Sequence, residues 1–170
     1  AEDAQGDAVS LHAATSDTDQ LNHGETPSMI HSLTDGWQSF TAGVSGFLQA
    51  VRLRQGGNTT QRVLRVYEGE GLSGELLIQE TFGAGGASNS WRRFAFSESV
   101  RLTAGQKYTL HFDAQGDPVG IYLDLSGDTY PAGRMGLSDA YDYLFETIML
   151  EPDATALPAW LSLSDNRQTA

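Results

Sequence analysis

Cysteine is absent from this chain of 170 residues, and positive charge is scarce: 10 Lys and Arg stand against 22 Asp and Glu, which gives a formal net charge of -12. The absence of thiols excludes disulfide bonds and thiolate metal sites. The shortage of positive charge argues against nucleic acid as a partner, because binding it needs a basic surface. It also disfavours an anionic membrane surface. The acidity fits solubility, a salty habitat or the binding of cations.

Long apolar runs and catalytic motifs are missing as well. No stretch approaches the roughly 20 residues that span a bilayer, and neither a Gly-x-Ser-x-Gly elbow nor a zincin helix motif occurs. Three of the four histidines, His12, His23 and His31, lie in a weakly patterned N-terminal segment, and His111 is expected on a solvated strand face. A glycosidase needs only two carboxylates, but no pair stands out among the 22 acidic residues. We therefore predict a non-catalytic chain, with a small hydrolase as the least favoured alternative.

What the sequence does contain is a series of short β-type runs separated by turns that are rich in glycine, of which there are 19. In residues 107–113, for example, Tyr108, Leu110 and Phe112 alternate with polar side chains, which is the pattern of a half-buried strand. The expected strands are 47–54, 61–68, 75–82, 91–97, 107–113, 119–125 and 141–150, with a further β-type run from Trp37 to Gly43. Strands of this length without an amphipathic helical window predict an all-β fold, an antiparallel jelly-roll β-sandwich.

The chain divides into three parts on this pattern. Residues 1–34 are polar and acidic, with a possible first strand at Val9–Ala13 and a loop or the start of an edge strand at Asp17–Gln20. Residues 35–150 carry the regular pattern of the sandwich core. Residues 151–170 are polar again and are expected to form a tail or a linker to a further domain.

The candidate ligand site lies in and around the long loop from Ser126 to Asp139, because loops of this length in compact domains are often functional. Binders of sugars and peptides present aromatic faces beside a few fixed polar groups. For Trp91 and Tyr122 the alternative is an ordinary place in the core. The predicted ligand-binding residues are Trp91, Tyr122, Asp124, Asp128, Tyr130 and Arg134.

Calcium is the cofactor that the acidic residues suggest. It binds several carboxylate and carbonyl oxygens at irregular loop positions. Asp17 and Asp19 lie near the start of the fold, and Asp139 and Asp142 precede its last strand; the first and last strands of an antiparallel sandwich are often neighbours. The alternative is that these residues cap turns.

Several segments resemble the jelly-roll β-sandwich modules of large bacterial extracellular proteins, which occur in adhesins and as accessory domains of secreted enzymes. The resemblance extends over Asp17–Leu150, and its motifs are Gly36–Gly43, Gly46–Leu48, Val66–Gly71, Leu102–Tyr108 and Tyr141–Phe145. The chain is also similar, more loosely, to the calcium-dependent ligand-binding domains of RTX-type adhesins. The resemblance implies a secreted or cell-surface module of a larger polypeptide without catalytic activity, and it assigns no ligand residue.

Together these observations predict carbohydrate binding in adhesion, with structural calcium and a glycan on another cell surface as the partner. One alternative is a peptide-binding adhesin domain, in which Arg134 or backbone amides would hold a terminal carboxylate. Another is a structural spacer of a large surface protein. Neither nucleic-acid binding nor membrane insertion is expected.

Overall fold

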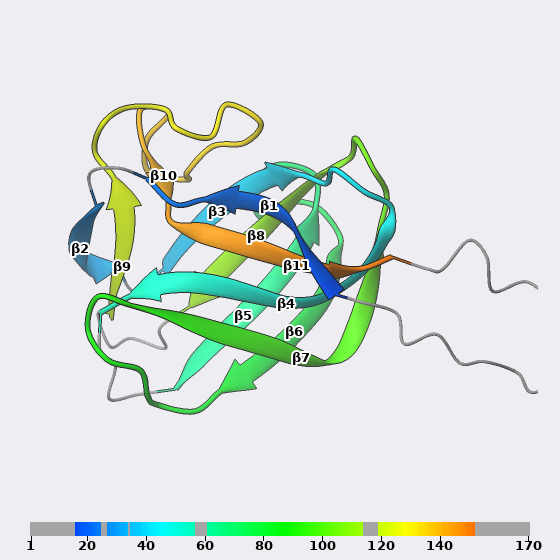
Figure 1. Cartoon of the computed structure of the whole chain (residues 1–170), viewed down its shortest axis with the longest axis horizontal. Helices are drawn as coiled ribbons and strands as arrows, with labels where there is room; N and C mark the ends of the chain where they lie inside the picture. Colours follow the sequence, from blue (N-terminus) through cyan, green and yellow to red (C-terminus); the bar gives the residue numbers. More distant parts are fainter. Residues whose placement is uncertain (1–15, 25–26, 34, 57–60, 114–118, 152–170) are drawn as a thin grey trace, which may run out of the picture.

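The computed structural model describes residues 16–24, 27–33, 35–56, 61–113 and 119–151. In this part of the chain eleven strands pair antiparallel in two sheets, and no residue is helical (Figure 1). The predicted all-β, antiparallel sandwich is therefore confirmed. Accordingly, the described residues include no helix long and apolar enough to cross a membrane.

The two sheets differ in size. The large sheet has the order β1 (Ser16–Asn22), β11 (Phe145–Leu150), β4 (Gly46–Gln55), β9 (Val119–Asp124) and β10 (Asp142–Tyr143); β2 (Pro27–Leu33) pairs with β9, and β7 (Ser90–Leu102) pairs with β4. The small sheet has the order β3 (Asp35–Thr41), β8 (Lys107–Asp113), β5 (Arg62–Glu68) and β6 (Leu76–Phe82). The small sheet lies behind the large one in the view of Figure 1. The first and last strands, β1 and β11, are neighbours as expected.

The core lies between the sheets and is built by alternation along the strands. In β4, Leu48, Val51 and Leu53 are fully buried, while Arg52 and Arg54, which alternate with Val51, Leu53 and Gln55, are only partly covered. The three residues predicted to face inward from β8 all belong to the same core. Each large apolar side chain removed from water in this way contributes about 1.5–3 kcal/mol to folding.

The outer face of β8 differs from the expectation. His111 is buried there instead of solvated, because Tyr67 of the neighbouring strand lies 6.1 Å from its ring centre and Arg65 Nη1 lies 3.3 Å from its Nδ1. The alternation assigned the correct face to this histidine. It could not show that longer side chains from β5 cover that face.

Several predicted strand limits differ from the observed ones. The predicted 91–97 strand is much longer, Ser90–Leu102, because a register shift at Leu48/Ala50 lets it continue along β4. The predicted 141–150 strand is divided into β10 and β11. Before residue 35 the structure has β1 and β2, which pair with β11 and β9. The candidate strand at Val9–Ala13 and the tail from residue 152 lie outside the described residues.

The long loop between β9 and β10 covers the open edge of the small sheet. Ser39 of β3 donates its backbone N–H to Arg134 O at 2.9 Å and accepts the Arg134 N–H on its hydroxyl at 2.9 Å. Thr41 donates its hydroxyl to Ala132 O. Gly133 is required between them, since a Cβ there would lie 1.9 Å from Ser39 O. An unpaired edge strand is thereby protected from pairing with another chain.

A buried polar network fastens this loop to both sheets. Gln38 of β3 donates its Nε2–H to Asp142 Oδ1 at 2.8 Å and accepts the Tyr143 backbone N–H on Oε1 at 3.0 Å. The other carboxylate oxygen of Asp142 accepts the N–H groups of Thr129 at 3.1 Å and Tyr130 at 3.0 Å. Burial raises the pKa of Asp142, and the hydrogen bond from Gln38 opposes that shift. Satisfied networks of this kind fix a single arrangement of the groups that they join.

Candidate functional site

The outer face of the large sheet carries a group of aromatic and charged side chains. Arg52 and Arg54 project outward from β4 between the buried residues of that strand, and Tyr122 projects outward from β9 between Ile121 and Leu123. Two further strands and two turns supply the other members. We define this group as the sheet-face cluster: His23, Arg52, Arg54, Asn89, Trp91, Tyr122 and Glu146.

Trp91 is the centre of the cluster. The ring of His23 lies 4.9 Å from the Trp91 ring centre at an angle of 50°, and the Arg52 guanidinium carbon lies 5.7 Å from it. Glu146 joins these two side chains, because its Oε1 contacts His23 Nε2 at 2.6 Å and its Oε2 accepts a hydrogen bond from Arg52 at 2.7 Å. The ring of Trp91 thus lies beside two polar side chains that share the Glu146 carboxylate.

A second aromatic side chain lies beside this centre. Arg54 places its guanidinium carbon 5.6 Å from the Tyr122 ring centre and donates its Nε–H to Asn89 Oδ1 at 2.8 Å. Asn89 has a φ of 58°, the left-handed region that asparagine tolerates better than most residues. Strand pairing aligns Arg54 with Trp91, so the two aromatic side chains belong to one continuous surface.

Local turns position the members that come from outside the sheet. Gly24 follows His23 with a φ of 55°, and a Cβ at this glycine would lie 2.5 Å from Asp124 Oδ2 and 2.6 Å from Leu144 Cδ2. Only glycine allows the chain to bend so closely over β9 at the end of β1. The bend leaves His23 beside Trp91 and above Glu146.

The burial of the charges determines what the cluster can do. Glu146 is 4% exposed and its two oxygens contact His23 and Arg52, whereas the His23 side chain is 55% exposed. The outer atoms of His23, Arg52 and Asn89 are therefore the polar groups that a ligand can reach. A His–carboxylate pair is also half of a hydrolytic triad, but within the described residues no serine or threonine hydroxyl is hydrogen-bonded to His23. The arrangement combines aromatic rings with polar groups that a ligand can reach.

Only two of the six residues predicted to bind a ligand, Trp91 and Tyr122, belong to the sheet-face cluster. Asp124 is fully buried and caps a turn, since its Oδ1 accepts from the N–H and the hydroxyl of Ser126 at 2.9 and 2.7 Å. Asp128 is exposed, and its charge adds to the raised pKa of Asp142. Neither carboxylate is a member of the sheet-face cluster, although Asp124 lies close to Gly24, the residue after His23.

Tyr130 belongs to the core. It is 7% exposed, its ring packs edge-on against Phe145 at 5.0 Å, and its hydroxyl donates to Gln20 Oε1 at 2.6 Å. The structure thus places this predicted ligand-binding residue in the core and not on an exposed loop. Its pKa is raised to about 12, mainly by burial, with smaller contributions from the charges of Asp19 and Asp142.

The pKa of Tyr130 leads to a prediction for alkaline pH. The pKa of the Tyr130 hydroxyl is near 10 in the unfolded chain and near 12 in the folded chain. Between pH 10 and pH 12 the unfolded chain therefore loses this proton while the folded chain keeps it. The free energy of unfolding falls as pH rises through this range, by about 2–3 kcal/mol in total. Tyr130→Phe removes the hydroxyl that donates to Gln20. We therefore expect this variant to be about 1 kcal/mol less stable than the wild type at pH 8. At pH 11 that deficit should shrink or reverse. Urea unfolding at both pH values measures it, and an unchanged deficit would contradict the prediction.

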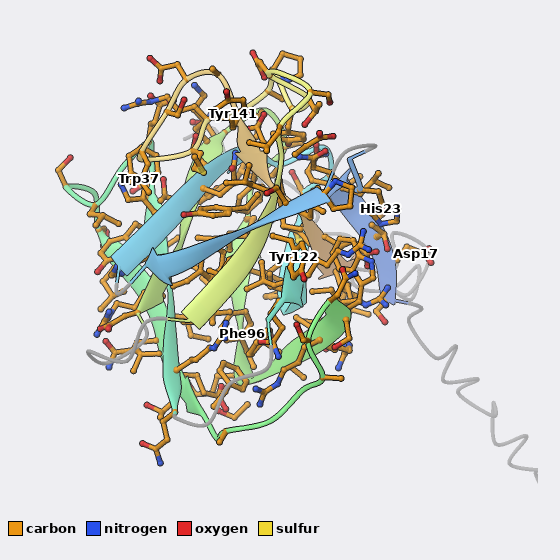
Figure 2. The ribbon with its side chains drawn as sticks, turned by 90° about the vertical axis from the view of Figure 1, so that its left-hand side faces the viewer. Asp17, His23, Trp37, Phe96, Tyr122 and Tyr141 are labelled. Carbon is orange, nitrogen blue, oxygen red and sulfur yellow. The ribbon has the colours of Figure 1, made fainter. Side chains whose placement is uncertain are left out.

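Arg134 lies in a different charged group. Its Nε and Nη1 donate to Glu70 at 2.7 Å and to Asp139 at 2.8 Å, and its guanidinium carbon lies 5.1 Å from the ring centre of Trp37. Hydrogen bonds from Lys107 and Arg134 lower the pKa of Glu70. Figure 2 shows Trp37 and His23 on opposite sides of the molecule, so this group is separate from the sheet-face cluster.

The four aspartates predicted to bind calcium are not brought together. Within the described ranges no three or more His, Asp or Glu side chains are arranged to hold a metal ion. Asp19 accepts the N–H groups of Gly43 and Val44, Asp139 pairs with Arg134, and Asp142 belongs to the buried network. Asp17 lies on the side of His23 in Figure 2, whereas Tyr141, the neighbour of Asp142, lies nearer to Trp37.

Calcium binding stays a prediction with a simple test. If calcium supports the fold, a thermal melt in millimolar calcium should show a higher Tm than a melt in EDTA, because a ligand of the folded state stabilises it by mass action. The exposed Asp17→Asn is the first variant to compare, because no hydrogen bond described for its side chain would be lost. Identical melts would remove calcium from the account.

The central residues His23, Arg52 and Glu146 were not predicted as site residues. They come from the end of β1, from β4 and from β11, and only strand register brings them together: Glu146 pairs with Arg52, and Leu21, two residues before His23, pairs with Glu146. The one available signal was the alternation in β4, which shows that Arg52 and Arg54 face outward.

Comparison with known proteins assigns the chain to a family. The family model of the domain of unknown function DUF4082 matches residues 15–125, well over half of the chain. The chain belongs to this family. The matched part includes every member of the sheet-face cluster except Glu146. No curated protein and no solved structure matches the chain.

Proposed function

We propose that the chain is a non-catalytic carbohydrate-binding module whose binding surface is the sheet-face cluster. The observation that carries the proposal is the half-buried ring of Trp91, which lies beside the ring of His23 and the guanidinium of Arg52. The apolar C–H face of a sugar packs on a ring of this kind, while fixed polar groups around the ring select its hydroxyls.

The polar groups around Trp91 suit hydroxyl ligands because they combine donors and acceptors in fixed places. Arg52 is held by Glu146, and Arg54 is held by Asn89. Neither side chain loses much freedom when a ligand binds, which lowers the entropic cost of association. Tyr122 offers a second ring beside the first, so the surface fits more than one sugar unit of an extended glycan.

The setting that we propose is adhesion outside the cell. The resemblance to jelly-roll modules of bacterial extracellular proteins supports it, and so does a cysteine-free chain with a net charge of -12. The partner would be a glycan on another cell surface, and the chain would be one module of a larger secreted or surface-anchored polypeptide.

In the peptide alternative, Arg134 or backbone amides would donate hydrogen bonds to a terminal carboxylate. The Nε and Nη1 of Arg134 already donate to Glu70 and Asp139, so a peptide terminus would compete with these two carboxylates, and the hydrogen bonds to them raise the pKa of Arg134 further. A purely structural spacer does not require an aromatic side chain fixed by polar contacts on an outer face. The spacer becomes the conclusion if no ligand is found.

A glycan array tests the proposal directly. The wild-type protein, labelled at an added terminal tag, should bind a defined set of glycans and should leave the remainder of the array blank. A blank glycan array combined with a positive peptide array would favour the peptide alternative. Blank results on both arrays would favour the spacer.

A further inference from the structure

One end of the space between the sheets is lined by polar side chains instead of apolar ones. Three strands each place a polar residue two positions beyond a fully buried core residue, on the same inward face. Gln55 follows Leu53 in β4, Arg62 precedes Leu64 in β5, and Arg92 precedes Phe94 in β7. We refer to Gln55, Arg62 and Arg92 as the polar end of the core.

Arg62 is the unusual member. Only 2% of it is exposed, and in the part of the chain that the structure describes neither its Nε nor its Nη2 has a hydrogen-bond partner. Burial, with a smaller contribution from the charge of Arg92, lowers its pKa to about 10, so the guanidinium is still charged at neutral pH. A buried charge without a partner is costly to a folded protein.

The neighbouring groups are already fixed around it. Arg92 donates to Gly83 O at 2.8 Å and to Gly85 O at 3.0 Å, and its guanidinium carbon lies 4.8 Å from the Phe94 ring centre. Gln55 donates its Nε2–H to the same Gly85 carbonyl at 3.0 Å, which leaves its buried Oε1 without a partner among the described residues. The site thus has a positive electrostatic field, two buried donor atoms without a hydrogen-bond partner and one buried acceptor without one.

The geometry points to an oxyanion as the missing partner, and we propose that the polar end of the core binds a carboxylate that also carries a hydroxyl group, as sugar acids do. Nε and Nη2 form the side of the guanidinium that holds a carboxylate through two parallel hydrogen bonds. The positive charge of Arg92 adds to the attraction, and Gln55 Oε1 accepts a hydroxyl proton. The exposed residues Gln61, Gly83 and Gly86 adjoin the site, so it lies close to the surface.

This site is independent of the proposed function, because none of its three residues belongs to the sheet-face cluster. Galacturonate is a suitable probe, and galactose is its uncharged counterpart. At a concentration near 100 times its Kd, galacturonate should raise the Tm of the wild type by about 5–10 °C. Galactose at the same concentration and ionic strength should leave the Tm unchanged.

Variants locate the effect. Arg62→Met should abolish the galacturonate shift and, without ligand, should melt at or above the wild-type Tm, because it removes a buried charge two of whose nitrogens have no hydrogen-bond partner. Arg62→Lys keeps the charge but loses the paired donors, so its affinity should fall at least tenfold. Arg93→Met, at an exposed position beside Arg92, and Trp91→Ala should both retain the shift.

Equal galacturonate shifts in the wild type and in Arg62→Lys would overturn the proposal, and so would the absence of any shift in the wild type. A shift that disappears in Trp91→Ala and persists in both Arg62 variants would assign the probe to the sheet-face cluster and would also overturn it. Because these outcomes differ, the result does not depend on whether the glycan array succeeds.

Discussion

Asp142→Asn is expected to lower the free energy of unfolding by about 3 kcal/mol. The wild-type carboxylate accepts three hydrogen bonds, one from Gln38 on Oδ1 and two from backbone N–H groups on Oδ2. An asparagine has one oxygen and one NH2 group. Its NH2 group must therefore face at least one of these donors, and a buried donor is left without an acceptor.

The size of this effect follows from the position of Asp142 in the fold. Its partners lie in β3 of the small sheet and in the loop that covers the edge of β3. One substitution therefore weakens the attachment of Asp142 to β3 and to the loop. Urea unfolding at pH 7 measures the change, with Asp17→Asn as the matched control, because Asp17 is exposed and is not among the groups that act on Asp142. The control should change stability by no more than about 0.5 kcal/mol. Equal stability of Asp142→Asn and the control would show that the network does not hold the loop.

Trp91→Ala is expected to weaken glycan binding at least 30-fold, or about 2 kcal/mol. The substitution removes the ring on which the proposed sugar packs. It also removes the contacts that this ring makes with His23 and Arg52. Trp91 is only half-buried, so the loss of affinity should exceed the loss of stability. Isothermal titration with the strongest glycan from the array measures the affinity, and circular dichroism melts monitor the fold.

Trp37→Ala is the matched control for this experiment. Trp37 is also half-buried and also lies beside an arginine, Arg134, but it is on the opposite side of the molecule from His23 (Figure 2). The account predicts an affinity within threefold of the wild type. If Trp37→Ala loses binding and Trp91→Ala keeps it, the binding surface lies over the long loop instead of the large sheet.

The core strands could be predicted from the sequence more accurately than the two N-terminal strands. Strands such as β5 and β8 alternate strongly, because one of their faces packs in the core, and their limits were predicted within one residue. β1 and β2 were harder to predict. β1 is the edge strand of the large sheet, and its residues Asp17, Thr18, Asp19 and Gln20 carry no apolar alternation. Its pairing with β11 depends on contacts more than 120 residues apart, as between Gln20 and Thr147, which no local pattern encodes.

The site was predicted only in part for the same reason. Composition and position identified Trp91 and Tyr122 as aromatic candidates, but the long loop proved to be an edge cover fastened by Asp142. Burial decided the role of Tyr130, and burial follows from tertiary packing. Glu146 looks like any acidic residue in the sequence; register alone places it between His23 and Arg52. A single sequence therefore suggests which residue types bind but does not show which of them meet.

The most direct test of the account is the indole N–H spectrum during a glycan titration. The chain has three tryptophans, so a 15N-labelled sample gives three indole signals, which single Trp→Phe variants assign. The account predicts that the Trp91 signal shifts progressively with the strongest glycan from the array while the Trp37 signal stays in place. Movement of the Trp37 signal with a stationary Trp91 signal would contradict the claim that the sheet-face cluster binds carbohydrate.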